Sequence, residues 1–216
     1  DFKSFNFKEK WFCNNLYYLN NYFKNSNDVS DILEIGSYEG RSAIFFLKTF
    51  KNSKITCVDT WSGSDEHLKK NFDIIEANFD TNTKSYQDDN RLKKIKNTSN
   101  DFFSNNFQSY DLIFVDGDHS SEQVKKDINN SWKMLNNGGY LILDDYLWWY
   151  YKDLKNNPAV TINNFISENL SNVSSISNKL QYAFSGKVSS QATASGIPVD
   201  FTTFLKGFPV LTLLET

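Results

Sequence analysis

The stretch DILEIGSYEGRSAIFFLKTF, residues 31–50, decides how the chain is expected to fold. A short apolar run ends at Gly36, a polar turn follows, and a helical pattern begins near Gly40 and continues through Phe50. Glycine at the end of the run lets the backbone turn tightly. A buried strand, a tight turn and a helix in this order are typical of the first unit of a parallel α/β sheet.

The same alternation of strand and helix continues along the chain. Further strands are expected at 54–59, 91–96, 111–116 and 140–143, with weaker ones near 173–177 and 180–187. Further helices are expected at 11–23, 64–79, 101–107 and 121–135, and from Pro158 onward. Asn137, Gly138 and Gly139 are expected to end the helix at 121–135, because Gly tolerates a left-handed C-cap. This order predicts an α/β, Rossmann-like fold: a doubly wound, mostly parallel seven-stranded sheet with helices on both faces.

Composition suggests where the domain ends. Asn and Lys are abundant up to about Lys187, whereas residues 189–216 contain no Asn and few charges. We therefore expect a single domain over residues 1–188, beginning with a helical segment at 1–30. Residues 189–216 are expected to be a C-terminal tail, to which the sequence assigns no role.

Net charge and cysteine usage argue against several classes of protein. The formal net charge is −3, which gives no electrostatic case for a nucleic-acid partner. Cys13 and Cys57 show neither metal-type nor disulfide-type spacing, so a reducing, cytoplasmic location is expected. No apolar run reaches the length of a membrane span and no signal peptide is visible, so no membrane partner is expected. A homo-oligomer is left open.

Acidic residues stand where the predicted strands end. In an open parallel sheet, ligands bind outside the carboxyl ends of the strands. Each acid alone could be a helix cap or a solvated loop residue, but together they indicate a site for positively charged ligands. These acids are Glu34, Asp59, Asp116, Asp144 and Asp145.

The turn after the first strand favours one kind of ligand. Gly36 and Gly40 do not fit the dinucleotide pattern G-x-G-x-x-G, and Glu34 would repel a phosphate, which disfavours a nicotinamide-dependent oxidoreductase. Glu34 would attract an ammonium group, while the helix start at Gly40 offers free N–H groups to a carboxylate. Asp59, about twenty residues further on, has the spacing of an acid that accepts both ribose hydroxyls. An amino acid joined to a ribose indicates S-adenosylmethionine.

The motifs together resemble those of class I S-adenosylmethionine-dependent methyltransferases. More narrowly, the chain resembles the metal-dependent small-molecule O-methyltransferases, such as the catechol and macrolide-sugar enzymes. The matching stretches ILEIGSYEGRSA, CVDTW, NTSND, LIFVDGDHS and NNGGYLILDDY follow the family's order from Ile32 to about Tyr146. The resemblance implies an enzyme that methylates a hydroxyl of a small molecule. The alternative is a non-catalytic cofactor-binding module of the same fold.

The resemblance also implies a set of residues around the methyl donor. The residues at the first turn would hold the methionine part, Asp59 the ribose, and residues 98–100 the adenine. Trp61 would either stack near the adenine or simply anchor its loop, and residues 98–100 could instead form a plain turn. The implied donor-binding residues are Glu34, Gly36, Ser37, Tyr38, Ser42, Asp59, Thr98, Ser99, Asn100 and Asp116.

Three carboxylates and one histidine suggest the chemistry. Asp116, Asp144 and Asp145 would repel one another without a compensating Lys or Arg, so they either take up protons or bind a cation. Oxygen ligands suit Mg²⁺ or another divalent cation, and the resemblance implies such an ion at these three residues. His119, three residues after Asp116, is the implied base, since an imidazole titrates near neutral pH. Its alternative role is a cap of the following helix.

The aromatic run YLWWYY at 146–151 follows the acid pair directly. Trp148 and Trp149 could wall the acceptor site, or they could be core anchors or an oligomer contact. His67, among charged residues, is expected at the solvated surface. The sequence leaves the acceptor open among sugars, phenols, and lipid or antibiotic intermediates.

Overall fold

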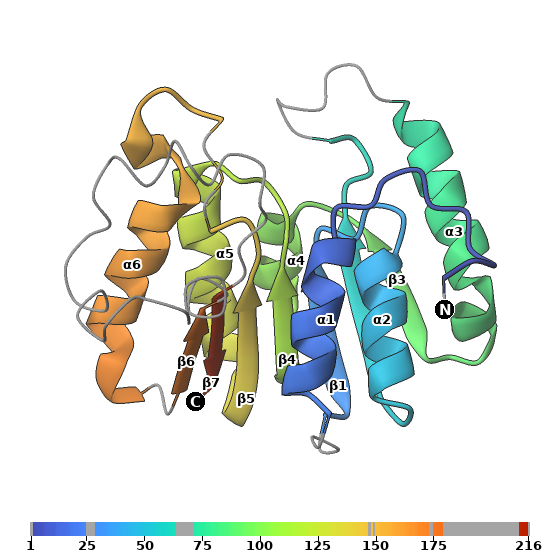
Figure 1. Ribbon diagram of the computed structural model, residues 1–216, viewed down its shortest axis with the longest axis horizontal. Coiled ribbons are helices and arrows are strands. Elements are labelled where there is room, and N and C mark those ends of the chain that lie inside the picture. Colours follow the sequence, from blue (N-terminus) through green and yellow to red (C-terminus); the bar gives the residue numbers. More distant parts are fainter. Residues whose placement is uncertain are drawn as a thin grey trace.

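The computed structural model describes residues 2–24, 29–63, 71–146, 148, 150–172, 175–178 and 212–215. A seven-stranded sheet with the order β3-β2-β1-β4-β5-β7-β6 forms its centre (Figure 1). The strands are β1 (Asp31–Ile35), β2 (Lys54–Asp59), β3 (Leu92–Lys96), β4 (Tyr110–Val115), β5 (Leu135–Leu143), β6 (Ser175–Asn178) and β7 (Thr212–Glu215). Strands β1 to β5 pair in parallel, and β7 pairs antiparallel with both β5 and β6. The predicted Rossmann-like sheet is confirmed.

Helices cover both faces of the sheet (Figure 1). They are α1 (Cys13–Tyr22), α2 (Arg41–Thr49), α3 (Phe72–Asp88), α4 (Ser99–Asn105), α5 (Ser121–Met134) and α6 (Pro158–Asn169), with short 3-10 turns η2 (Leu154–Asn156) and η3 (Leu170–Asn172). Leu112 and Phe114 of β4 face the core under α1, α2 and α3, whereas Ile113 and Val115 face the core under α4, α5 and α6. Successive strand residues point to opposite faces, so a continuous apolar run indicates a strand buried on both sides.

One expected helix is displaced along the chain. The sequence predicts it at 64–79, but α3 begins after Asn71, whose side chain accepts a hydrogen bond from the amide of Ile74. The start of the expected range lies outside the described residues. Helix α3 continues to Asp88, and Asn82, which lies beyond the expected end at 79, is buried in it with hydrogen-bond partners.

The expectation that Asn137, Gly138 and Gly139 end α5 is wrong. The helix ends at Met134, and these residues lie within β5. Gly138 has a φ of 77°, and the register between β4 and β5 shifts between Tyr110 and Leu112. The glycine therefore serves an irregularity in the strand, another place where positive φ is needed.

The other expected elements are confirmed, with bounds that differ by a few residues, except that the strand expected near 180–187 lies outside the described residues. Thr212–Glu215, from the expected tail, forms β7 between β5 and β6, and Leu214 is fully buried. This part of the tail therefore belongs to the sheet. Among the described helices, none combines the length and apolarity needed to cross a membrane.

Candidate active site

The site lies at one edge of the sheet, here called the carboxyl edge: the last residues of β1, β2, β4 and β5 and the residues that directly follow them. The neighbouring strand ends are in register, with Ile35 beside Val115 and Val115 beside Leu143. Backbone bonds extend this pairing, because the amide of Asp116 donates to Ile35 (2.8 Å) and that of Asp144 to Val115 (3.0 Å). The predicted acids on β4 and β5 are therefore neighbours in space.

Glu34 is the most deeply buried of the predicted site residues. It lies within β1 and is fully buried, and neither of its carboxylate oxygens has a hydrogen-bond partner. Burial raises its pKa to about 7, while the nearby side chains of Ser37 and Ser42 lower it in part. The buried hydroxyl of Ser37 also lacks a partner. A group of unpaired polar atoms at one place fits a polar, positively charged ligand.

The turn at 36–40 is held by Asp59. Gly36, Tyr38 and Gly40 all have positive φ, which is costly for a tyrosine. One oxygen of Asp59 accepts from the amides of Ser37 (2.8 Å) and Tyr38 (2.9 Å), and the other accepts from the amide of Trp61 (2.7 Å). The Trp61 indole donates to the Tyr38 carbonyl (2.9 Å). Trp61 therefore anchors the turn, and the ribose role of Asp59 stays a prediction.

The predicted adenine residues lie at the start of α4. Thr98 is the N-cap, and its hydroxyl accepts from the amide of Asp101. The side-chain Nε2 of Gln123 on α5 donates to Ser99 Oγ (3.1 Å) and Asn100 Oδ1 (3.3 Å).

The same nitrogen of Gln123 lies 2.9 Å from Oδ1 of Asp127, one turn further along α5. Asp127 is buried, and burial raises its pKa to about 6. Sequence reasoning missed both residues, because their positions match an ordinary helix surface.

The structure brings together Asp116, His119 and Asp145. Nε2 of His119 lies 3.0 Å from Oδ2 of Asp145 and 3.5 Å from Oδ1 of Asp116. One ligand atom from each of the three residues lies within 4.8 Å of the others. Asp116 keeps 29% of its side-chain surface exposed, yet burial by the surrounding protein, with a smaller effect from Asp145, raises its pKa to about 6. The two residues predicted to be catalytic, Asp116 and His119, therefore lie next to each other.

Asp144 lies beside this group and faces another partner. Both of its oxygens lie within hydrogen-bond distance of the Asn15 amide group, at 2.9 and 3.2 Å, and one accepts from the amide of Asp145. Burial, and then the charges of Asp116 and Asp145, raise the pKa of Asp144 well above its usual range. Asn15 is fully buried on α1, and sequence reasoning missed it. Whether Asp144 contacts a metal directly stays a prediction.

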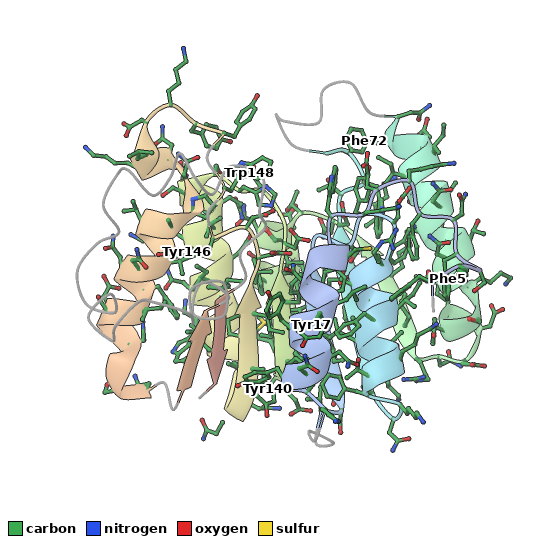
Figure 2. The ribbon with its side chains drawn as sticks, viewed as in Figure 1. Phe5, Tyr17, Phe72, Tyr140, Tyr146 and Trp148 are labelled. Carbon is green, nitrogen blue, oxygen red and sulfur yellow. The ribbon has the colours of Figure 1, made fainter. Side chains whose placement is uncertain are left out.

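Trp148 lies against His119, the predicted base. Its ring centroid is 4.9 Å from that of His119 and 6.5 Å from that of Tyr150, on which it stacks. Figure 2 places Trp148 near the upper edge of the sheet, the edge at which β4 and β5 end. Its indole Nε1 is buried and makes no hydrogen bond.

Other residues around the site have simpler roles or are not described. Asp118 accepts from the amide of Ser120 (2.7 Å), as expected for a loop acid, while Ser120 itself is the N-cap of α5. Trp149 and His67 lie outside the described residues.

Comparison with known proteins agrees with this geometry. Residues 33–146 match a family model described as a methyltransferase domain. An uncharacterised protein of Acanthamoeba polyphaga mimivirus is 33% identical over 119 residues, which are 53% of this chain and 50% of that protein. The chain thus spans about half the length of this curated relative.

Two solved structures share the fold at low sequence identity. An O-methyltransferase from Bacillus cereus, in complex with S-adenosylhomocysteine, is 13% identical with a TM-score of 0.54, covering 94% of this chain and 80% of that one. The O-methyltransferase TomG of Streptomyces achromogenes, in complex with S-adenosylmethionine, is 12% identical with a TM-score of 0.54, covering 94% and 78%. Because the family match covers more than half of the chain, the chain belongs to the methyltransferase-domain family.

Proposed function

We propose that the protein transfers a methyl group from S-adenosylmethionine to a hydroxyl of a small molecule, with the help of a divalent cation. One observation carries the proposal: Asp116, His119 and Asp145 converge at the carboxyl edge that also holds the unpaired carboxylate of Glu34. An acceptor with a proton to lose and a donor with positive charge would thus meet at one place. The two O-methyltransferases of the same fold support this choice of acceptor.

The donor site would use residues of the first turn. Glu34 would face the positive charge of the donor, since its oxygens are buried and unpaired. The hydroxyl of Ser37 and the start of α2 near Ser42 would meet the donor carboxylate. Asp59 would add its ribose contact to the amides that it already holds, and residues 98–100 would line the adenine. When bound, the donor supplies an activated methyl group on sulfur.

The residues present also fit a divalent cation. Two oxygens that each coordinate Mg²⁺ at about 2.1 Å lie up to about 4 Å apart, and the ligand atoms of Asp116 and Asp145 lie within 4.8 Å. Burial, and to a smaller extent repulsion between the acids, raises the pKa of Asp116 and of Asp144, and a cation would relieve the repulsion. Asp116 and Asp145 would hold the ion, with Asp144 beside it. A bound ion would lower the pKa of the acceptor hydroxyl.

His119 would accept the proton of the acceptor. The hydroxyl proton moves to Nε2 as the acceptor oxygen bonds to the methyl carbon, and the electrons of the carbon–sulfur bond go to sulfur. Asp116 and Asp145, both within 3.5 Å of Nε2, stabilise the imidazolium that forms. The rest of the catalysis is alignment of oxygen and methyl carbon.

A turnover assay tests this function. The purified chain is given S-adenosylmethionine and a panel of catechol, phenol and sugar acceptors, and S-adenosylhomocysteine formation is measured with Mg²⁺ or with EDTA. We expect formation that needs both an acceptor and Mg²⁺, and an O-methylated product by mass spectrometry. Tight donor binding without turnover on any acceptor would instead support the non-catalytic cofactor-binding module.

The titration of Glu34 predicts pH-dependent donor binding. Its pKa of about 7 in the empty site means that the carboxylate is mostly protonated at pH 6 and mostly charged at pH 8. If only the charged form binds the donor ammonium, affinity for S-adenosylhomocysteine rises about tenfold from pH 6 to pH 8. Calorimetry over this range measures it.

The raised pKa of Glu34 also predicts that the stability of the protein without donor falls as pH rises. A carboxyl whose pKa is raised by folding favours the folded state less as pH rises, so stability falls between about pH 4.5 and pH 7. Asp116 and Asp127 titrate in a similar range, so the comparison with Glu34→Gln isolates this residue. A pH profile of donor affinity that is equally steep in Glu34→Gln would contradict the assignment.

Trp148 is predicted to donate a hydrogen bond to the acceptor. Trp148→Phe keeps an aromatic ring beside His119 but removes the buried, unpaired Nε1–H. Loss of one neutral hydrogen bond is expected to raise the KM of the acceptor about fivefold, with kcat and donor affinity unchanged. The control is Tyr150→Phe, since Tyr150 is 54% exposed. Equal acceptor KM values in the two variants would count against this role.

A further inference from the structure

The N-terminal strap, residues 2–10, contacts the turn at 36–40, here called the donor turn because the proposed function places it at the methyl donor. In Figure 1 it crosses from α3, above the upper end of α2, to the start of α1, and Figure 2 labels Phe5 on it. The strap precedes every strand of the sheet, and neither the predicted site residues nor the proposed function involves it. Its contacts nevertheless converge on residues 37–41.

Glu39 joins three segments of the chain. It lies in the donor turn and is 2% exposed. One carboxylate oxygen accepts from the amide of Lys8 in the strap (2.7 Å), and the other accepts from the Asn78 side chain on α3 (2.8 Å). Its backbone carbonyl accepts from the Asn82 side chain (3.0 Å). Both hydrogen-bond donors to this buried carboxylate, a backbone amide and a side-chain amide, are neutral groups.

Asn6 connects the strap to the same two residues of α3. Its amide donates to Asn82 Oδ1 (2.7 Å), its side chain donates to Asn78 Oδ1 (2.6 Å), and its carbonyl accepts from Asn82 (3.1 Å). Asn78 and Asn82 are one helical turn apart and are both buried. Their side chains therefore bridge the strap and the donor turn.

Arg41, the first residue of α2, adds a second connection. Its guanidinium donates to the carbonyl of Glu9 (2.7 Å) and lies 4.1 Å from the ring centroid of Phe7. Trp11, just after the strap, packs against Tyr38 with ring centroids 5.1 Å apart. Both sides of the donor turn are thus fixed to the start of the chain.

Burying a carboxylate that has only neutral hydrogen-bond donors costs desolvation free energy, so a purely structural role is a poor explanation for Glu39. The turn that it supports contains Tyr38 at a φ of 47° between two glycines of positive φ, a conformation that surrounding contacts must impose. Asp59 holds this turn from the β2 side, and Glu39 holds it from the α3 side. The turn carries Ser37 and Tyr38 and leads directly into Ser42, all proposed to contact the donor.

We infer that Glu39 is a positioning residue of the donor site, and that docking of the N-terminal strap and binding of the donor are coupled. Glu39 shapes the turn without touching the donor. This inference rests on the proposed donor-binding role of residues 37–42, and not on the acceptor or the metal. Because coupling is reciprocal, donor binding stabilises the docked strap as much as the docked strap favours donor binding.

The first test is Glu39→Gln, which keeps the shape of the side chain. It places an NH₂ group against either the N–H of Lys8 or the NH₂ of Asn78, so one of the two hydrogen bonds is lost. The dissociation constant of S-adenosylhomocysteine is expected to rise about tenfold, within the usual range of such couplings. The KM of the donor should rise with it, whereas kcat at saturating donor stays within about twofold. Asn6→Ala, which unties the strap without altering the turn, should weaken binding in the same direction.

Hydrogen exchange provides the second readout. In the wild-type protein, saturating S-adenosylhomocysteine should slow exchange of the strap amides, including that of Lys8. In Glu39→Gln this protection should be lost. The control is Ser53→Ala, which removes a buried hydrogen bond to the Phe50 carbonyl at the far end of α2, so it should lower the unfolding temperature without changing donor affinity.

The outcomes separate this inference from the proposed function. A wild-type protein that binds no S-adenosylhomocysteine overturns the donor site itself. If the wild type binds and Glu39→Gln binds equally well, with strap protection intact, only the coupling fails. Should Glu39→Gln not fold, Asn6→Ala decides the question, and unchanged affinity in that variant overturns the inference.

Discussion

Replacing His119 by Gln is expected to lower kcat for a sugar hydroxyl about a thousandfold, within the range typical of a lost general base. Gln keeps a polar side chain near Asp116 and Asp145 but cannot accept and hold a proton. The affinity for S-adenosylhomocysteine should be unchanged, because His119 lies at the acceptor side of the carboxyl edge. The half-saturating Mg²⁺ concentration should also stay the same if Asp116 and Asp145 hold the ion.

The acceptor's own acidity makes this prediction specific to a base. An acceptor whose hydroxyl is already ionised at the assay pH has no proton for His119 to accept, so the loss with it should be small. Asp118→Asn is the matched control, because Asp118 is one residue away and accepts a hydrogen bond from the loop amide of Ser120. A loss of equal size for acidic and weakly acidic acceptors would assign His119 a structural role, and a raised Mg²⁺ requirement would make it a metal ligand.

The parts of this site that could be read from the sequence are those fixed by local pattern. Apolar runs that stop at acids located the ends of β2, β4 and β5, and the run that stops at Gly36 located the end of β1. Parallel strands bring such ends to one edge. Asp116 and Asp145 were therefore expected to be neighbours, and the offset of three residues brought His119 to the same point.

The parts that the sequence did not reveal depend on long-range pairing. Asn15 contacts Asp144 across 129 positions, and no pattern in an aromatic helix distinguishes it from an exposed amide. Asn82 lies beyond the helix expected at 64–79, yet partners from the strap and the donor turn make its burial possible. Strand β7 has four residues, too few for a periodicity to appear.

Replacing Gly36 by Ala is expected to disrupt the site and the sheet together. A Cβ atom there would lie 1.9 Å from the carbonyl oxygen of Asp116 and 2.9 Å from Cα of Gly117, both backbone atoms that cannot rotate away. The amide of Asp116 also donates to Ile35 (2.8 Å), so any outward shift breaks the last bond between β1 and β4. We expect the free energy of unfolding to fall by about 3 kcal/mol or more, because of overpacking and of the positive φ.

This loss corresponds to a fall of roughly 6–12 °C in unfolding temperature for a chain of this size. Circular dichroism measures the fall. Because the displaced backbone carries the carboxylate of Asp116, turnover should fall further than stability alone predicts, at temperatures where the variant is folded.

Gly138→Ala separates close contact from backbone strain. Gly138 has nearly the same φ as Gly36, 77° against 83°, but nothing lies within 4 Å of the position that a Cβ would take. Its replacement should therefore cost only the penalty of positive φ, about 1–2 kcal/mol, and should leave turnover intact. Equal unfolding temperatures and equal activities of Gly36→Ala and Gly138→Ala would contradict this prediction. They would mean that the backbone near Gly36 can shift away from Asp116 without loss, so that the close approach of the donor turn to Asp116 is not required for the site.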